Sequence, residues 1–242
     1  MENVISVSNL VKNGILNNIS FDIKKGEMVA IMGPSGSGKS TLLYNVSGMD
    51  KADSGKVIIS GHEITGMNED EKAAFRLNNA GFVFQNMNML SNLNIFDNII
   101  YPAVNAKKAN KNEINEYAKC LMEKMGISEL ALREIREVSG GQLQRACICR
   151  SMINKPEILF ADEPTGALNQ SSSKDVMDAF EAINNEGTTI MIVTHDSKVA
   201  KRCGRIIFVV DGKIAGDIKI DKALSEEERS SVVDNKLKEL GW

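Results

Sequence analysis

The segment best equipped for chemistry is a glycine-rich run that ends in lysine, serine and threonine. It fits the phosphate-binding pattern G-x-x-x-x-G-K-[ST] and consists of Gly33, Pro34, Ser35, Gly36, Ser37, Gly38, Lys39, Ser40 and Thr41. The glycines allow backbone N–H groups to turn toward phosphate oxygens. Lys39 would reach the β- and γ-phosphates, and Ser40 would bind Mg²⁺. The run therefore predicts an ATP site, and the alternative interpretation is a glycine-rich turn before a core helix.

Two acids at the end of an apolar segment are the next candidates. Asp162 and Glu163 follow residues 158–161, which have the composition of a buried strand. Phosphoryl-transfer enzymes place one carboxylate on Mg²⁺ and use another group to orient or deprotonate the nucleophile. We therefore assign Asp162 to the metal and Glu163 to the attacking water as general base. The alternative is a solvated pair of acids at a strand end.

Two more polar residues end predicted strands. His195 follows the apolar residues 189–193, and Gln85 follows residues 82–84. Ligands of open α/β sheets bind at the carboxyl ends of the strands, so His195 is a catalytic candidate and Gln85 could reach the metal or the water. A structural histidine and an ordinary loop amide are the alternatives.

A second anion-binding segment opens a predicted helix. Ser139 is a good N-cap, and Gly140, Gly141 and Gln142 follow it. A chain that binds one nucleotide has no obvious use for a second such site within itself. The alternative is a plain capped start of a helix.

The elements that position these residues alternate between apolar strands and helices, which predicts an α/β fold with a mainly parallel sheet. Residues 4–11 and 15–23, joined by Asn13-Gly14, predict a hairpin, and residues 57–59 a further strand of the same antiparallel layer. Residues 97–101, 113–125 and 141–153 favour helices, as do residues 172–184.

We expect one domain over residues 1–242. Residues 1–85 and 155–220 form its core with the β layer, and residues 86–154 form an inserted helical subdomain. Residues 221–242 form a helical tail, whose capping box at Ser225 and short apolar stripe predict packing on its own domain. A helix that binds a partner is the alternative for the tail.

Composition narrows the classes of function. The chain has 242 residues, 25% of them charged, with a net charge of −3, which argues against a broad nucleic-acid surface. No apolar run approaches the roughly 18–20 residues that span a bilayer, and the N-terminus lacks the pattern of a signal peptide, so we expect a cytoplasmic chain. The four cysteines lack C-x-x-C spacing, which favours buried free thiols over a metal site or a disulfide.

Taken in order, these motifs resemble the ATP-binding cassette (ABC) ATPases over nearly the whole chain. The family's Walker A motif corresponds to Gly33–Ser40, its Q-loop to Gln85, its signature to Ser139–Gln142, its Walker B motif to residues 158–162 with Glu163, and its switch histidine to His195. The resemblance implies a P-loop NTPase (RecA-like) core with an antiparallel β subdomain and an inserted helical subdomain. Flanking residues resemble the group that includes the lipoprotein-release, macrolide-export and antimicrobial-peptide-resistance ATPases.

The resemblance also implies a mechanism and partners. Two chains bind head to tail as a homodimer around two ATP molecules and Mg²⁺, and the signature of one chain holds the γ-phosphate bound by the other. Glu163 and His195 support attack by water. Closure drives an integral membrane permease subunit, which docks near Gln85 and holds the chain at the inner face of the membrane.

Two departures from the family pattern stand out. The family's D-loop continues Ala-Leu-Asp, whereas this chain reads Ala167-Leu168-Asn169, and no aromatic residue between Asn9 and Leu16 is present to stack on adenine.

Alternative functions are a soluble ABC ATPase that acts on nucleic acid or ribosomes, and a regulatory module without turnover. The single cassette and the mild acidity argue against the first, and the presence of Glu163 and His195 argues against the second.

Overall fold

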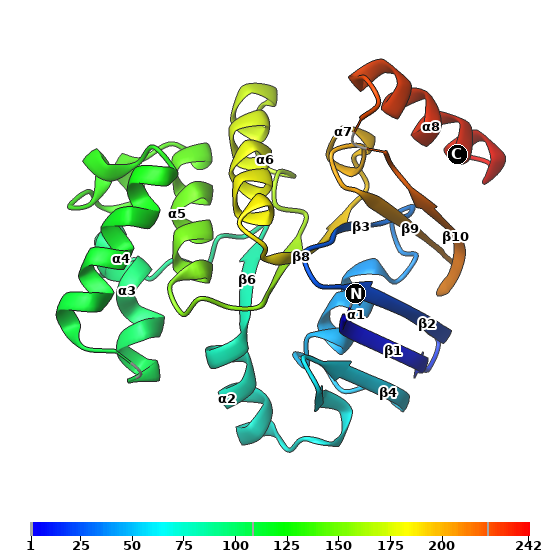
Figure 1. The fold of residues 1–242 in the computed structure, drawn as a ribbon, viewed down its shortest axis with the longest axis horizontal. Coiled ribbons are helices and arrows are strands. Elements are labelled where there is room, and N and C mark those ends of the chain that lie inside the picture. Colours follow the sequence, from blue (N-terminus) through cyan, green and yellow to red (C-terminus); the bar gives the residue numbers. More distant parts are fainter. Residues whose placement is uncertain (1, 108, 222) are drawn as a thin grey trace.

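The uninterrupted apolar runs become the strands of a six-stranded sheet in the computed structural model, which describes residues 2–107, 109–221 and 223–242 (Figure 1). The strand order is β10-β9-β3-β8-β7-β6, and every neighbouring pair is parallel except β10 with β9. The strands are β3 (Met28–Met32), β6 (Ala80–Phe84), β7 (Ile158–Asp162), β8 (Thr189–Thr194), β9 (Arg205–Val210) and β10 (Lys213–Lys219).

Both faces of this sheet are covered, which explains why its central strands are apolar at successive positions. In β3, Val29 and Ile31 face one hydrophobic cluster, and Met28, Ala30 and Met32 face another. All five residues are buried. The sheet therefore lies between two cores.

The first core is closed by a second, antiparallel sheet with the strand order β2-β1-β4-β5. Its strands are β1 (Asn3–Lys12), β2 (Leu16–Lys24), β4 (Ser54–Ile59) and β5 (His62–Glu63). The predicted hairpin is confirmed, and Gly14 supplies the positive φ of 76° that its turn requires. Helix α1 (Lys39–Val46) packs into the same core through Leu42, Leu43 and Val46.

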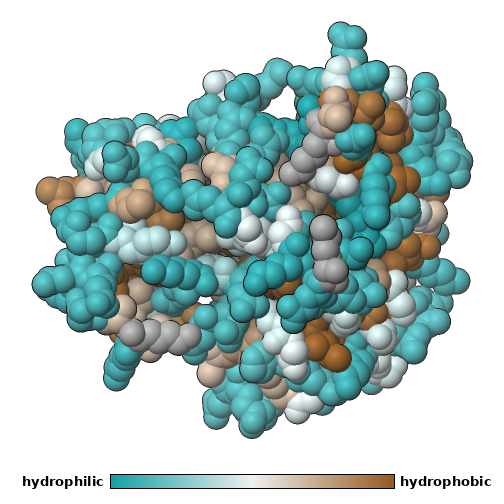
Figure 2. Space-filling model, viewed as in Figure 1, coloured by the Kyte–Doolittle hydropathy of each residue, from teal (hydrophilic) through white to brown (hydrophobic). Residues whose placement is uncertain are grey.

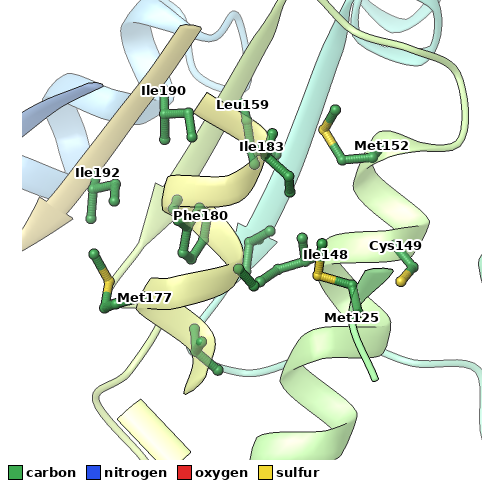
Figure 3. Close-up of a cluster of buried hydrophobic side chains, with 14 of the residues drawn as sticks. Met125, Ile148, Cys149, Met152, Leu159, Met177, Phe180, Ile183, Ile190 and Ile192 are labelled. Atoms are coloured by element: carbon green, nitrogen blue, oxygen red, sulfur yellow. The ribbon is translucent and has the colours of Figure 1, made fainter. Parts of the chain in front are cut away.

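The second core joins the sheet to helices. Isoleucine and methionine side chains from α5 (Gly140–Met152) and α6 (Gln170–Asn185) meet Leu159, Ile190 and Ile192 of the sheet (Figure 3). Beyond α5 lie α3 (Ile95–Ala106) and α4 (Lys111–Lys124), which complete the predicted helical subdomain at the left of Figure 1. The remaining helices are α2 (Glu69–Asn79), α7 (Ser197–Ala200) and α8 (Glu226–Glu239), with 3₁₀ turns at Ile64–Gly66, Ser128–Leu130 and Ile135–Glu137.

Helix α3 is longer than the sequence predicts. It continues through Pro102 to Ala106, although an internal proline costs a helix about 3 kcal/mol. Its buried face, which includes Ile95, Ile99 and Ala103, packs in the second core on both sides of the proline. Tertiary packing of that face outweighs the local preference to end.

The C-terminal tail packs on its own domain, as predicted. Val233 of α8 is fully buried, and Trp242 meets the ring of Phe208 edge to face at 6.1 Å. Lys201, just after α7, forms an ion pair with Glu226 at 2.9 Å. Hydrophilic residues cover most of the face in Figure 2, and hydrophobic residues gather on its right-hand side, where α8 and β10 lie.

The cysteines follow the prediction with one exception. Cys147, Cys149 and Cys203 are buried, but Cys120 is exposed because it lies on the outer face of α4, so the prediction of burial was wrong there. None of the four cysteines forms a disulfide. Among the described residues, none of the helices combines the length and the apolar composition of a membrane span.

Candidate functional site

The glycine-rich run connects strand β3 to helix α1, as its pattern predicts. Gly38 is the N-cap of α1 and has a φ of 96°, a conformation that residues with side chains rarely adopt. A Cβ on Gly33 would collide with the carbonyl oxygen of Val209. The chain therefore passes closely under β9 and delivers the amides at the start of α1 to an open cavity, where an anion is favoured.

Lys39 is held inside this loop. Its side chain folds back so that Nζ donates to the carbonyl oxygen of Pro34 at 2.8 Å, and the residue is only 8% exposed. Burial lowers the pKa of Lys39, while the negative charges of Glu163 and Asp162 act in the opposite direction. The ammonium group is thus placed where phosphate oxygens could replace the carbonyl as its partner.

Asp162 ends β7, between β6 and β8, and both of its carboxylate oxygens accept hydrogen bonds from α1. Ser40 Oγ donates to Oδ1 at 2.9 Å, and the Tyr44 hydroxyl donates to Oδ2 at 2.7 Å. Two of the three predicted metal-binding residues, Ser40 and Asp162, are therefore brought together across 122 residues of sequence, whereas the third, Gln85, does not make this contact.

Glu163 and His195 also meet. Glu163 Oε1 lies 2.8 Å from His195 Nδ1, and Thr194 Oγ1 donates to Glu163 Oε2 at 3.4 Å. Because an ionised carboxylate only accepts hydrogen bonds, Nδ1 carries the proton in this contact. Glu163 has a φ of 47°, a conformation that concentrates at functional sites.

A cavity of about 790 Å³ lies in front of these groups. Its lining combines the glycine-rich run, the two catalytic candidates and one aliphatic residue: Pro34, Ser35, Gly36, Gly38, Lys39, Ser40, Thr41, Glu163, His195 and Ile15. Glu163 and His195 also line a second cavity of about 1050 Å³ between α6, α7 and the start of α8. Glu163 and His195 therefore lie between the phosphate loop and the cavity that Leu168 of the D-loop lines.

Two predicted elements lie away from this cavity lining. Gln85 follows β6 and sits beside Gly166, where a Cβ would come within 2.9 Å of Gln85 Nε2. Ser139 caps α5, with a reciprocal capping box to Gln142, and Ser139 and Gly140 are exposed. The structure thus brings Ser40, Asp162, Glu163 and His195 together. At the start of α5 it leaves Ser139 and Gly140 exposed, whereas Gly141 is buried.

Two residues of the site, Tyr44 and Ile15, were not predicted from the sequence. Tyr44 lies four residues after Ser40, so helical spacing alone places it on the same face of α1. Ile15 follows the tight turn of the hairpin, is 43% exposed, and its Cγ2 lies against Gly38. The only sequence signal for Ile15 is that an apolar residue directly follows the Asn13-Gly14 turn.

Comparisons with known proteins agree with this geometry. The family model described as "ABC transporter" matches residues 16–166, more than half of the chain. The "Bacitracin export ATP-binding protein BceA" of Halalkalibacterium halodurans is 42% identical over 206 residues, which cover 85% of this chain and 81% of that protein. The "Macrolide export ATP-binding/permease protein MacB" of Campylobacter jejuni is 43% identical over 89% of this chain, but the match spans only 33% of that protein's length.

Among solved structures, a dimeric post-hydrolysis state of the ATP-binding cassette MJ0796, bound to ADP and Pi, superposes with a TM-score of 0.81 at 33% identity. The match covers 90% of this chain and 99% of that one. The predicted fold class, a P-loop core with an antiparallel β subdomain and an inserted helical subdomain, is confirmed. The chain therefore belongs to the ABC transporter family, as one of its ATP-hydrolysing cassettes.

Proposed function

We propose that the chain forms an ATP-sandwiched homodimer and powers a separate integral membrane permease subunit that exports peptides, lipids or drugs. The observation that carries the dimer is the exposure of Ser139 and Gly140 at the start of α5. An exposed helix N-terminus favours an anion, and the phosphate loop of the same chain does not include it. A second copy in the opposite orientation supplies the phosphate that this segment lacks.

The donors at the phosphate loop fit Mg²⁺. Magnesium prefers oxygen ligands and is typically held by one or two carboxylates together with substrate phosphates. Ser40 and Asp162 offer a hydroxyl and a carboxylate, and within the described residues no cluster of three or more His, Cys, Asp or Glu forms a metal cage. Gln85 adds an amide oxygen from the end of β6. When bound, the metal neutralises charge on the β- and γ-phosphates.

Hydrolysis of ATP to ADP and phosphate then uses the remaining groups of this edge. Lys39 places its positive charge on the β- and γ-phosphates. Glu163 accepts the proton of the attacking water, and His195 holds the Glu163 carboxylate in place through Nδ1. The left-handed backbone of Glu163 keeps its carboxylate at the cavity rather than in the strand.

The permease docks beside Gln85. The segment after Gln85 is fixed to α3, because Asn98 Oδ1 accepts from the amide of Leu90. Leu90 is 40% exposed, and Tyr101 and Val104 of α3 are 48% and 51% exposed. These apolar side chains favour a protein partner at this face. Docking there places the chain at the inner face of the membrane. The names of two relatives, a macrolide exporter and a bacitracin exporter, favour drugs or antimicrobial peptides as cargo.

A complementation experiment tests the dimer. Lys39→Ala disables the phosphate loop. Gly140→Asp places a negative charge where the partner's γ-phosphate must sit, while an acid in the first turn of α5 does not weaken the helix. Each variant alone should be inactive. In a 1:1 mixture roughly half of the dimers are mixed, and each holds one intact site, so about a quarter of the ATPase activity should return.

The neutral change Gly140→Ala is the matched control and should retain far more activity than Gly140→Asp. A mixture that stays inactive although mixed dimers are present by mass spectrometry contradicts the proposal.

The permease is tested by co-purification from native membranes. Recovery with ribosomes or nucleic acid instead would favour the alternative function.

A further inference from the structure

Tyr44 makes a contact that none of the sequence motifs requires. Its hydroxyl donates to Asp162 Oδ2 at 2.7 Å, while Ser40, one helical turn earlier, donates to Asp162 Oδ1 at 2.9 Å. One face of α1 therefore holds both oxygens of the carboxylate that we assign to Mg²⁺.

Both ends of this contact are rigid. The carbonyl oxygen of Tyr44 accepts from the amides of Met49 and Asp50 at 2.8 and 2.9 Å, which fixes the end of α1. Asp162 lies in the parallel sheet, opposite Phe84 of β6 and Val193 of β8. Because the backbone is anchored at both residues, the hydrogen bond from Tyr44 sets the orientation of the Asp162 carboxylate.

The Tyr44 hydroxyl is the donor of this contact, and a carboxylate oxygen of Asp162 is the acceptor. A hydrogen bond to a carboxylate is shorter and roughly twice as strong as one between neutral groups. The plane of the Asp162 carboxylate is therefore fixed before a metal arrives.

We propose that Tyr44 is a positioning residue for magnesium: it holds Asp162 Oδ2 so that Oδ1, beside Ser40, faces the metal. The proposal rests on the magnesium site of the proposed function. A purely structural role, in which the ring only packs α1 against the sheet, would affect nucleotide binding with and without metal alike. The two roles differ in the part of the nucleotide affinity that magnesium adds.

The test compares the wild-type chain with Tyr44→Phe, which keeps the ring and removes only the hydroxyl. Affinity for ADP is measured by titration calorimetry in EDTA and again in excess Mg²⁺. We expect the affinity in EDTA to stay within about twofold. The gain in affinity from Mg²⁺ should fall about tenfold, which corresponds to ~1.4 kcal/mol.

Tyr117→Phe is the matched control, because Tyr117 is a partly buried tyrosine on α4 that stacks under Lys155, away from the nucleotide cavity. It should leave both affinities unchanged. An undiminished magnesium gain in Tyr44→Phe would overturn the proposal. A wild-type chain whose ADP affinity does not respond to Mg²⁺ would overturn the metal assignment itself, and the positioning role with it.

A double-mutant cycle shows whether Tyr44 acts through Asp162. In an Asp162→Asn background, Tyr44→Phe should cause no further loss of the magnesium gain, because the carboxylate that the hydroxyl positions is already gone. An equal tenfold loss in both backgrounds would mean that Tyr44 affects the metal without Asp162, and the proposal would be wrong.

Discussion

The phosphate loop and the signature segment are both glycine-containing starts of helices, yet they differ in what surrounds them. At the loop, each charged group already has a partner in the chain: Lys39 binds a carbonyl oxygen, Asp162 binds two hydroxyls, and Glu163 meets His195. At the signature, the side chains of Ser139 and Gln142 accept from each other's backbone amides, and Ser139 and Gly140 are exposed.

This difference shows how the work of a site can be divided between two surfaces. Groups that must stabilise developing charge are most effective when they are fixed in advance and shielded from water. Such an arrangement is built from residues far apart in one chain, as the pairing of Ser40 with Asp162 shows. The start of α5 is exposed and can bind an anion that another molecule supplies. It needs no anion for stability, because Ser139 already caps the helix.

The largest effect should come from Lys39→Ala. The change removes the only charge that the phosphate loop places on the nucleotide, so we expect ATPase activity to fall by about 10²–10³-fold or more, with much weaker ATP binding. Steady-state phosphate release from the purified chain measures the first and equilibrium titration the second. Lys51→Ala, at an exposed lysine shortly after α1, is the control. Unchanged activity in Lys39→Ala would refute the assignment of the loop.

Glu163→Gln should separate binding from turnover. The amide still reaches His195 but cannot accept a proton from water, so turnover should fall about 10²–10⁴-fold while ATP still binds. The variant should accumulate as a dimer in MgATP, which sizing chromatography detects. Glu186→Gln breaks only a surface ion pair with Lys124 and should change neither property.

Two separate outcomes of that experiment would count against the proposed function. A Glu163→Gln chain that remains monomeric at saturating MgATP contradicts the sandwich dimer. Turnover at the wild-type rate contradicts Glu163 as the general base. In either case, another explanation would be needed for why the groups at the phosphate loop have partners within the chain while the start of the signature is exposed.

The motifs made the loop predictable, because each lies within a few residues and dictates its own backbone. The sheet was predictable from apolar runs, and the cap at Ser139 from its type and position. Helix α2 and strand β10 were missed. A capping box between Asn68 and Glu71 marks the start of α2. The helix has few buried residues, so its sequence shows little hydrophobic periodicity. Strand β10 is an edge strand whose exposed alternate positions resemble a loop.

Contacts between distant segments were beyond reach for a different reason. Tyr44 and Asp162 are 118 residues apart, and no local pattern links a helix position to the end of one particular strand. The same holds for Ile15, which reaches Gly38 only because the hairpin folds over the loop. Sequence patterns therefore identified the groups that do chemistry better than the groups that hold them.

Discrimination among nucleotides should be weak. Among the described residues that line the nucleotide cavity there is no Phe, Tyr or Trp, and Ile15 offers only an aliphatic surface, which does not read hydrogen-bonding edges. We expect ATP and GTP to bind within about tenfold of each other, or ~1.4 kcal/mol, in competition titrations. Ile15→Ala should weaken both alike. A preference for ATP of a hundredfold or more would mean that another group contacts the base.

The smallest effect on binding is expected for Asn169→Asp in the D-loop. Asn169 is the N-cap of α6, and its Oδ1 accepts from the amide of Ser172 at 2.9 Å. Aspartate caps helices as well as asparagine does, so the fold should be unaffected. Affinity of the monomer for ATP should stay within about threefold, or ~0.65 kcal/mol, because the residue lies outside the lining of its own nucleotide cavity.

Turnover should nevertheless change, because the loop lies between the catalytic Glu163 and the surface that we assign to the dimer, where a new carboxylate would meet the opposite chain. Steady-state ATPase rates and cooperativity, with the permease present where it can be obtained, measure this effect. Asn110→Asp makes the same substitution at the N-cap of α4 and should leave turnover unchanged, which separates capping from contact across the dimer. If Asn169→Asp instead lowers ATP affinity sharply while turnover per bound nucleotide is preserved, Asn169 serves its own nucleotide pocket. The D-loop would then act within its own chain, together with the phosphate loop, and not on the opposite chain.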